Sequence, residues 1–434
     1  MEQIETVIIG GGQAGLAMSY YLGQLGSEHV ILERHRVAER WQSERWDSLA
    51  FQSPNWNIRL PGFAFQTADP DAFASRDEVF RFIEDYAAFI RAPVGCGMPA
   101  TSLRAETASR LLIVETPESL FRAKNVVIAI GPFQLPADHL PIGGSALHLH
   151  SSRYRNPQQL PSGAVLVIGS GNSGAQIAEE LCAAGRQVFL SVSKHRRIPR
   201  RYRGKDYAWW YIAFGEGDTT VDQQREPLSP RLLTGVGDGH DLDLRHLAAH
   251  GVVLLGRVLG GRDGRLTLAT DLAEDLARAD ASLVDFMRQA DGYAARQGLD
   301  LPDSETGSEA LPTPREVTDP IVTLDLATAG ISTIILANGF RYDFNWVDLP
   351  IFADSAKSSR RVPVHQRGIT RVPGVYFLGL PWLHKLKSAF LHGVGDDAAY
   401  LAERMTSHGN PWPNSRSREQ KPPSGYETPV EFSN

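Results

Sequence analysis

Two glycine-rich segments carry the residue types and spacing best suited to chemistry in this chain. They are Gly10-Gly11-Gly12-Gln13-Ala14-Gly15 and Gly169-Ser170-Gly171-Asn172-Ser173-Gly174. In such a segment the first glycine makes a tight turn, the second lets the backbone approach a pyrophosphate, and the third lets a helix pack closely on a strand. The amide donors at the start of that helix then attract the phosphates. Two copies predict a protein that holds two dinucleotides at once and moves a hydride from a nicotinamide to a flavin.

The residues around the first segment predict that it binds FAD. An apolar run at 6–9 precedes the segment and is typical of a buried parallel strand, and apolar residues at helical spacing follow it. A second apolar run at 29–32 ends in Glu33, whose carboxylate can accept hydrogen bonds from the ribose hydroxyls of a dinucleotide. The contacts predicted here are Gly10, Gly12, Gln13, Ala14, Gly15, Glu33 and Arg34.

The second segment repeats the pattern of strand and helix, but no carboxylate follows its second strand. The strand expected at 187–192 continues into Ser193 and Lys194, with Arg197 beyond. A carboxylate would repel a 2′-phosphate, whereas a hydroxyl and cations would hold one, so the sequence favours NADPH, with NADH as an alternative. The other interpretation is that this basic run is only a solvent-exposed face. The contacts predicted here are Gly169, Gly171, Ser173, Gly174, Ser193, Lys194 and Arg197.

Composition limits the class of protein. A chain of 434 residues can form two domains with sizeable cores, and 42% hydrophobic with 22% charged residues is typical of a globular protein. A formal net charge of −6 makes nucleic acid an unexpected partner. The apolar runs are too short to span a bilayer, and a strand begins where a secretory signal would lie. We therefore expect a cytoplasmic protein without a transmembrane segment, acting on a small molecule, with a homodimer left open.

Cysteine and histidine positions argue against two further kinds of site. The chain has two cysteines, Cys96 and Cys182, and no Cys-x-x-Cys motif. Flavoproteins that reduce disulfides need a redox-active cysteine pair, so this class is not expected. The histidines show no zinc-type clustering with cysteine or carboxylate, and we expect no metal.

The elements that position these residues predict an α/β fold with two Rossmann-like dinucleotide-binding domains, the NADPH domain being inserted in the FAD domain. We expect the first part of the FAD domain at 1–158, the NADP domain with a helical insertion at 159–325, and the second part of the FAD domain at 326–408. Within these parts the pattern predicts two amphipathic helices at 272–277 and 282–297, strands at 331–336 and 375–378, and a helix at 395–405. A polar, acidic loop is expected at 302–314, and residues 304–309 within it and the tail at 409–434 are expected to be mobile.

Together, several motifs resemble the class B flavin-dependent monooxygenases, and most closely the bacterial branch labelled as flavoproteins involved in potassium transport. The motifs that carry the resemblance are both glycine segments, Trp41 with 45–49, the linker at 150–154, and the stretches 200–204, 337–340 and 379–384. The chain departs from that family where Glu39-Arg40 replaces a Gly-Gly pair. The resemblance adds further expected cofactor contacts, which are Trp41, Ser53, Ala129, Gly131, Asn338, Gly379 and Leu380.

The resemblance also implies a function. It implies an FAD-dependent, NAD(P)H-consuming monooxygenase that reacts with O₂, forms a C4a-(hydro)peroxyflavin and oxygenates a small organic substrate. Gln52 and Asn172 are the expected catalytic residues, at the junction of nicotinamide and flavin. Tyr154, where Baeyer–Villiger enzymes carry Trp, favours oxygenation at nitrogen or sulfur. The alternatives are a carbonyl-directed oxygenase of the Baeyer–Villiger or oxidative-decarboxylation type, and a reductase or redox sensor that does not oxygenate.

An aromatic cluster has two interpretations. Its members could line the access of substrate, or they could pack between the domains. The cluster comprises Tyr207, Trp209, Trp210, Tyr211 and Phe214.

Overall fold

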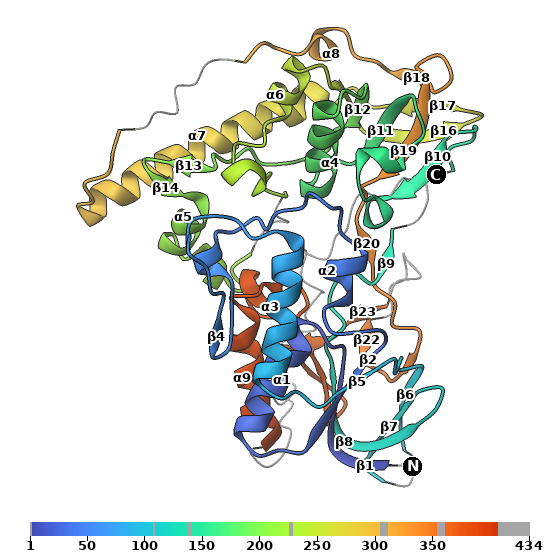
Figure 1. Cartoon of the computed structure of the whole chain (residues 1–434), viewed down its shortest axis with the longest axis vertical. Helices are drawn as coiled ribbons and strands as arrows, with labels where there is room; N and C mark the ends of the chain where they lie inside the picture. Colours follow the sequence, from blue (N-terminus) through green and yellow to red (C-terminus); the bar gives the residue numbers. More distant parts are fainter. Residues whose placement is uncertain are drawn as a thin grey trace.

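The computed structural model describes residues 2–106, 109–137, 141–224, 229–303, 311–353 and 361–406 (Figure 1). The segments predicted to be mobile at 304–309 and 409–434 lie outside these residues. Two sheets divide the described chain into two units, which occupy the lower and upper halves of Figure 1. We call them the first and second unit in the order in which their glycine segments occur.

The first unit is built on a ten-stranded sheet with the order β21-β6-β7-β8-β1-β2-β5, to which β26, β25 and β24 are joined through β8. Its central strands are parallel and buried on both faces, as the β-branched runs predict. The bounds are β1 Glu2–Ile9, β2 His29–Glu33, β5 Val94–Cys96, β6 Ser102–Ala105, β7 Leu112–Glu115, β8 Leu120–Ile128, β21 Val347–Asp348, β24 His365–Gln366, β25 Ile369–Thr370 and β26 Val375–Phe377.

Three helices pack beside this sheet: α1 (Gln13–Gln24), α3 (Arg76–Phe89) and α9 (Val394–Thr406). Helix α3 begins with a capping box, in which Ser75 and Glu78 each accept from the other's backbone amide. Helix α1 begins directly after Gly12 and has no side-chain cap, so its first amide donors are left for another partner. The prediction of a helix near 395–405 is confirmed by α9.

The second unit has a five-stranded parallel sheet with the order β10-β19-β11-β12-β15. Helices α4 (Asn172–Ala183), α6 (Leu244–Ala249) and the start of α7 cover one face, and a three-stranded antiparallel sheet covers the other. The bounds are β10 Leu147–His150, β11 Ala164–Ile168, β12 Val188–Ser191, β15 Val253–Leu255, β16 Val258–Arg262, β17 Arg265–Leu268, β18 Thr323–Asp325 and β19 Ile331–Leu336.

The second sheet interrupts the first along the chain, which confirms the insertion, but its extent differs from the predicted range 159–325. Strand β10 lies before this range and β19 lies after it, and both belong to the second sheet. Local patterns could not reveal this, because the strand that pairs with both β10 and β11 is β19, which lies far away in the chain. The pairing of β19 with β11, rather than its own sequence, assigns it to the second unit.

The prediction of two helices at 272–277 and 282–297 is wrong, because one helix, α7 (Leu272–Gln297), covers both. The residues 278–281 contain neither Gly nor Pro, so nothing breaks the helix there. Ala279 is buried within it, and Gly298 ends it at φ +62°. Helix α5 (Tyr207–Ala213) lies against α7, and Trp210 is fully buried with its ring 6.4 Å from that of Phe286. Packing between α5 and α7 therefore accounts for the buried part of the aromatic cluster.

The remaining elements are short. They are helices α2 Glu39–Ser43 and α8 Arg315–Thr318, the 3₁₀ turns Asn55–Asn57, Ser151–Arg153, Pro157–Gln159, Glu216–Asp218, Val236–Asp238 and Leu386–Ala389, and strands β3 Arg59–Leu60, β4 Phe63–Ala64, β9 Leu135–Pro136, β13 Arg201–Tyr202, β14 Lys205–Asp206, β20 Phe340–Arg341, β22 Phe352–Ala353 and β23 Val362–Pro363. Among the described residues, no helix has the length and apolar character needed to cross a bilayer.

Candidate functional site

The first glycine segment forms an open cradle at the carboxyl edge of the first sheet. Gly10 has φ +113°, and a Cβ there would lie 2.6 Å from the backbone oxygen of Ala129, so only glycine fits the turn. A Cβ on Gly15 would overlap the Gly10 carbonyl, which explains the third glycine. A Cβ on Gly12, by contrast, would meet nothing within 4 Å. This space, together with the uncapped amides of Gln13 and Ala14, fits the pyrophosphate of a dinucleotide.

Glu33 lies against this segment. Its Oε2 accepts a hydrogen bond from the Gly11 amide at 2.7 Å, and its Oε1 accepts from the His35 amide at 2.9 Å. A carboxylate has about four acceptor sites, so it can still accept from ribose hydroxyls. The neighbouring Arg34 is exposed.

The second glycine segment repeats the cradle on the second sheet. Gly169 has φ +103°, and a Cβ there would lie 2.6 Å from the Ala337 oxygen, while a Cβ on Gly174 would overlap the Gly169 carbonyl. Gly171 is open in the same way as Gly12. Helix α4 begins after Gly171 without a side-chain cap, and Ser173 is half-buried in its first turn. The second segment therefore also fits a dinucleotide.

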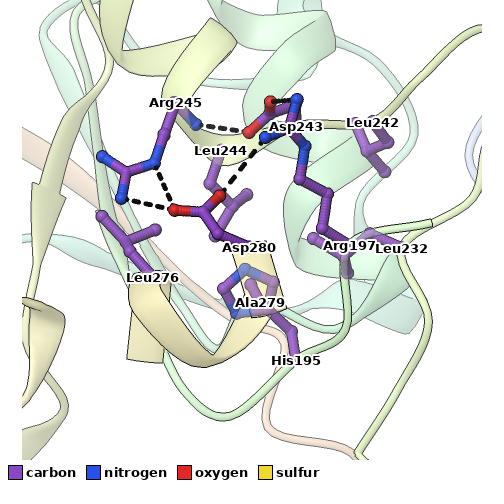
Figure 2. A pocket seen from close by; sticks show the side chains of 10 residues that line it. All are labelled: His195, Arg197, Leu232, Leu242, Asp243, Leu244, Arg245, Leu276, Ala279 and Asp280. Carbon is purple, nitrogen blue, oxygen red and sulfur yellow. Dashed lines mark hydrogen bonds and ion pairs between the residues drawn. The ribbon is translucent and has the colours of Figure 1, made fainter. Parts of the chain in front are cut away.

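The basic run after β12 separates into two groups. Ser193 is anchored by its amide, which donates to Ser170 Oγ at 2.9 Å, and the Lys194 side chain is exposed. Arg197 instead forms ion pairs with Asp243 at 2.8 Å and with Asp280 at 3.3 Å. Figure 2 shows Arg197 with Asp243 and Asp280, and with Arg245, which also pairs with Asp280. The recess they line has no space for a water molecule, so it is a packed ion-pair cluster.

The side-chain amides of Gln13 and Asn172 connect each segment to a later part of its own unit. Gln13 Nε2 donates to the Ala389 oxygen at 2.6 Å. Asn172 Oδ1 accepts from the Leu233 amide at 2.8 Å. The amide oxygen of Asn172 thus holds the chain that follows, a role that its sequence position does not indicate.

Further residues of the expected site line the edges of the two sheets. Gly379 follows β26, and a Cβ on it would touch Ala14 of the first segment. Ala129 and Gly131 follow β8 at the same edge, and Leu380 is buried. Asn338, however, follows β19 of the second sheet, and its amide lies 3.5 Å from a Cβ built on Gly169. It is therefore next to the second segment rather than the first.

The loop that carries Gln52 lies between the two units. The backbone oxygen of Gln52 accepts a hydrogen bond from Arg200 Nη1 at 2.9 Å, and Ser53 Oγ accepts one from Asn57 Nδ2 at 2.8 Å. The Trp41 ring is half-buried, 5.8 Å from the ring of Phe51. In the sequence Arg200 is one residue of a longer motif, and nothing in its neighbours indicates that it reaches the first unit.

The linker at 150–154 meets residues of both units at Glu180 of α4. Tyr154 is fully buried, and its hydroxyl donates to Glu180 Oε2 of α4 at 2.7 Å. Burial and this carboxylate raise the pKa of Tyr154 well above its ordinary value. Ser48 of the first unit donates to the other oxygen of Glu180 at 2.8 Å. The Tyr154 hydroxyl therefore attaches the linker to helix α4.

His384 and His392 lie between β26 and α9 of the first unit. His384 Nδ1 is 3.9 Å from Asp397 Oδ1, which Arg367 Nε also contacts at 3.2 Å. Asp397 is buried near the start of α9, and sequence reasoning missed it. Burial lowers the pKa of His392 to about 4, so this ring is neutral at pH 7.

The two cysteines lie in different units, Cys96 on β5 and Cys182 on α4. The described part of the chain contains no group of three His, Cys, Asp or Glu side chains that could hold a metal ion.

Comparisons with known proteins agree with this geometry. The family model described as pyridine nucleotide-disulphide oxidoreductase matches residues 7–207. A CzcO-like oxidoreductase of Geobacillus kaustophilus is 31% identical, with 93% of this chain and 99% of that protein covered. CzcO of Bacillus subtilis is 30% identical over 92% and 99% of the two chains. An indole-3-pyruvate monooxygenase of rice, YUCCA8, is 30% identical over 46% of this chain and 50% of its own.

Solved structures of low sequence identity show the same fold. A flavin-containing monooxygenase from Stenotrophomonas maltophilia has a TM-score of 0.64 at 20% identity, covering 94% of this chain and 99% of its own. An ornithine N-hydroxylase from Kutzneria sp. 744, described with reduced FAD, NADP⁺ and L-ornithine, has a TM-score of 0.58 at 16% identity, covering 93% and 99%. The chain belongs to the CzcO-like oxidoreductases and has the fold of the flavin-containing monooxygenases.

Proposed function

We propose that this enzyme consumes NADPH and O₂ to oxygenate a small organic substrate, most readily at a nitrogen or sulfur atom. The observation that carries the proposal is the pair of open cradles at Gly12 and Gly171, one on each sheet, in two units joined through Gln52 and Arg200. A protein that held one dinucleotide would need only one such cradle.

The residues divide between the two ligands as follows. Gly12 and the amides that begin α1 would hold the pyrophosphate of FAD, and Glu33 its ribose. Gly171 and the amides that begin α4 would hold the pyrophosphate of the nicotinamide dinucleotide. Ser193 and Lys194 would hold a 2′-phosphate, because Lys194 is exposed whereas Arg197 is already paired with two carboxylates.

FAD, when bound, supplies the chemistry of hydride acceptance and oxygen activation. The protein's part is to hold the two ligands in place and to exclude water, which would otherwise release peroxide. Gln52 and Asn172 would contribute to this: the Gln52 backbone oxygen accepts from Arg200, and Asn172 Oδ1 accepts from the Leu233 amide. The His392 ring centroid lies 6.1 Å from that of Tyr211, and burial lowers the pKa of His392 to about 4.

Reduction of a disulfide fits the chain poorly, because a redox-active pair needs two cysteines within disulfide distance and the only two lie in different units. Oxygenation next to a carbonyl is a second candidate, favoured by the likeness of part of this chain to plant enzymes named for indole-3-pyruvate. The preference for nitrogen or sulfur rests on the resemblance alone, through Tyr154 at the position where Baeyer–Villiger enzymes carry Trp.

The test is to mix the reduced enzyme rapidly with O₂ in the presence of NADP⁺ and to record the flavin spectrum. A long-lived absorbance of the oxygen adduct, followed by product formed in proportion to NADPH consumed, supports the proposal. Immediate return of the oxidised spectrum with one peroxide per NADPH, for every amine, thioether and ketone tried, contradicts it. Product from ketones or keto acids alone would instead favour the second candidate.

A further inference from the structure

One buried guanidinium joins the two units beside the Gln52 loop. Arg200 is 1% exposed and directly precedes β13 in the second unit. Its Nε and Nη2 donate to the two carboxylate oxygens of Asp206, at 2.8 and 2.5 Å. Its Nη1 donates to the backbone oxygen of Gln52 in the first unit, at 2.9 Å. Arg200 therefore holds a carboxylate of its own unit and a carbonyl of the other.

The first unit also supplies the ring that covers this guanidinium. The Phe73 ring centroid lies 4.8 Å from Arg200 Cζ, which is within the range of a cation–π contact. The turn of the second unit near Gly239 packs on the same ring so closely that a Cβ on Gly239 would lie 2.7 Å from Phe73 and 2.9 Å from Arg200. The contact between the units is therefore dry and closely packed around one cation.

The partners of Arg200 are themselves held in place. Asp206 Oδ1 also accepts from the Ala208 amide at 2.7 Å and so caps helix α5. The Arg200 amide donates to Asp241 Oδ1 at 2.6 Å. A planar guanidinium can satisfy a carboxylate with one edge and a carbonyl with its remaining nitrogen, whereas an ammonium group is a single point charge. The arrangement thus requires Arg rather than a positive charge alone.

We propose that Arg200 is a positioning residue that fixes the Gln52 loop against the second unit, so that the nicotinamide held there stays within reach of the flavin. The proposal rests on the proposed function for the identity of the two ligands. It concerns the hydride step, in which bound NADPH would give up a hydride and become NADP⁺, and bound FAD would accept that hydride together with a proton from solvent. Oxygenation comes afterwards, so the two proposals can fail separately.

The test measures anaerobic reduction of enzyme-bound FAD by NADPH in a stopped-flow instrument, for the wild type and Arg200→Lys. We expect the limiting rate to fall about tenfold, because small misplacement of a bound reactant is costly in rate. The apparent Kd for NADPH should change by less than about twofold, because the cradle at Gly171 is not altered. FAD content and complete reduction by dithionite should match the wild type.

Arg201→Lys is the matched control. The Arg201 guanidinium donates to the backbone oxygens of Gly239 and Asp238, at 3.1 and 2.8 Å. Because both acceptors belong to its own unit, the Arg201→Lys substitution should leave the limiting rate unchanged. An Arg200→Lys enzyme that retains FAD and the wild-type limiting rate overturns the proposal, as does an equal loss in Arg201→Lys.

A second variant covers the case in which Arg200→Lys does not fold. Phe73→Leu removes the covering ring from the first unit while leaving the Arg200–Asp206 pair intact. It should lower the limiting rate in the same direction by a smaller factor, and an unchanged rate contradicts the proposal. If the wild type forms no oxygenated product with any substrate, the proposed function fails, but these reduction rates still decide the role of Arg200.

Discussion

The two glycine segments have nearly the same backbone and differ in what surrounds them. Each is flanked by an alanine from the neighbouring strand: Ala129 donates to the Ile9 oxygen and Ala337 to the Ile168 oxygen, both at 2.8 Å. The first and third glycines of each are required by close backbone approach, and the middle glycine of each is open. This shared backbone fits a dinucleotide in both segments, but it does not determine which dinucleotide each segment binds.

The difference lies at the end of the next strand. After β2, the Glu33 carboxylate turns back onto the Gly11 amide. After β12, Ser193 is fixed by Ser170 and Lys194 is exposed to solvent. A carboxylate suits the hydroxyls of an unmodified ribose, and a cation suits a phosphate. We therefore infer that residues outside the glycine motif, Glu33 in one case and Ser193 with Lys194 in the other, set the preference of each cradle.

The largest expected effect comes from a valine in each open position. Gly12 has φ −91° and extended ψ, so Gly12→Val should be tolerated by the fold but should block the approach of the pyrophosphate. FAD retention should fall by more than about a hundredfold, which corresponds to about 3 kcal/mol. The measurement is the FAD-to-protein ratio after gel filtration, together with the Tm of the apoprotein, which should be unchanged.

Gly171→Val is the counterpart in the second cradle. Its backbone is equally compatible with valine, at φ −69° and extended ψ. This variant should keep FAD and raise the KM for NADPH by about tenfold or more, because only the nicotinamide dinucleotide is blocked. Loss of FAD alone from both variants would show that the two segments are assigned wrongly.

The features of the two segments that could be predicted from the sequence are those that depend on short stretches of it. Both glycine segments, their flanking strands and Glu33 follow from apolar runs and turn residues in short windows, and the confirmed fold class follows from them. The pairing of β19 with β11 could not be predicted, because it joins strands more than a hundred residues apart, from 164–168 to 331–336. For the same reason the sequence places Asn338 in the FAD part of the chain, whereas the structure places it beside the second segment.

Side-chain partners are the least predictable feature. The basic run predicts that Arg197 faces a phosphate, but Asp243 and Asp280 approach it from α6's N-cap and from α7. The role of Arg200 depends on Gln52 and Phe73 of the other unit. Contacts between residues far apart in the chain leave no local signal in the sequence.

The second prediction tests the carboxylate half of the comparison. Glu33→Gln keeps the size of the side chain but lowers its strength as an acceptor for the Gly11 amide and for ribose hydroxyls. FAD affinity should fall by about tenfold, a smaller effect than that of Gly12→Val, because one charge-assisted interaction is weakened and the pyrophosphate site stays open. Fluorescence titration of the apoprotein with FAD measures the Kd, and an unchanged Kd would show that Glu33 does not contact FAD.

The third prediction tests the cationic half. Lys194→Ala should raise the KM for NADPH about threefold to tenfold while leaving the KM for NADH unchanged, because an exposed lysine contributes a screened interaction with the 2′-phosphate alone. Steady-state NAD(P)H oxidation at low ionic strength measures both constants. The control is Arg197→Ala, where two carboxylates lose their partner. That change should lower Tm, and a specific loss of NADPH affinity in it would assign the phosphate to Arg197 instead.

The smallest expected effect compares how the units respond to acid. His365 and His392 belong to the first unit, and burial lowers the pKa of each to about 4. An unfolded histidine has a pKa near 6.5, so between about pH 6.5 and 4 the unfolded state binds more protons and stability falls as the pH falls. Each of these two histidines should lower the free energy of unfolding by about 1 kcal/mol for each pH unit in that window.

His392→Gln should reduce the loss of Tm between pH 6.5 and 5, and the exposed His35→Gln is the control. Equal pH profiles for the wild type and both variants would show that acid sensitivity originates elsewhere, and the buried His195 of the second unit, whose pKa is also lowered by burial, would be the next to test.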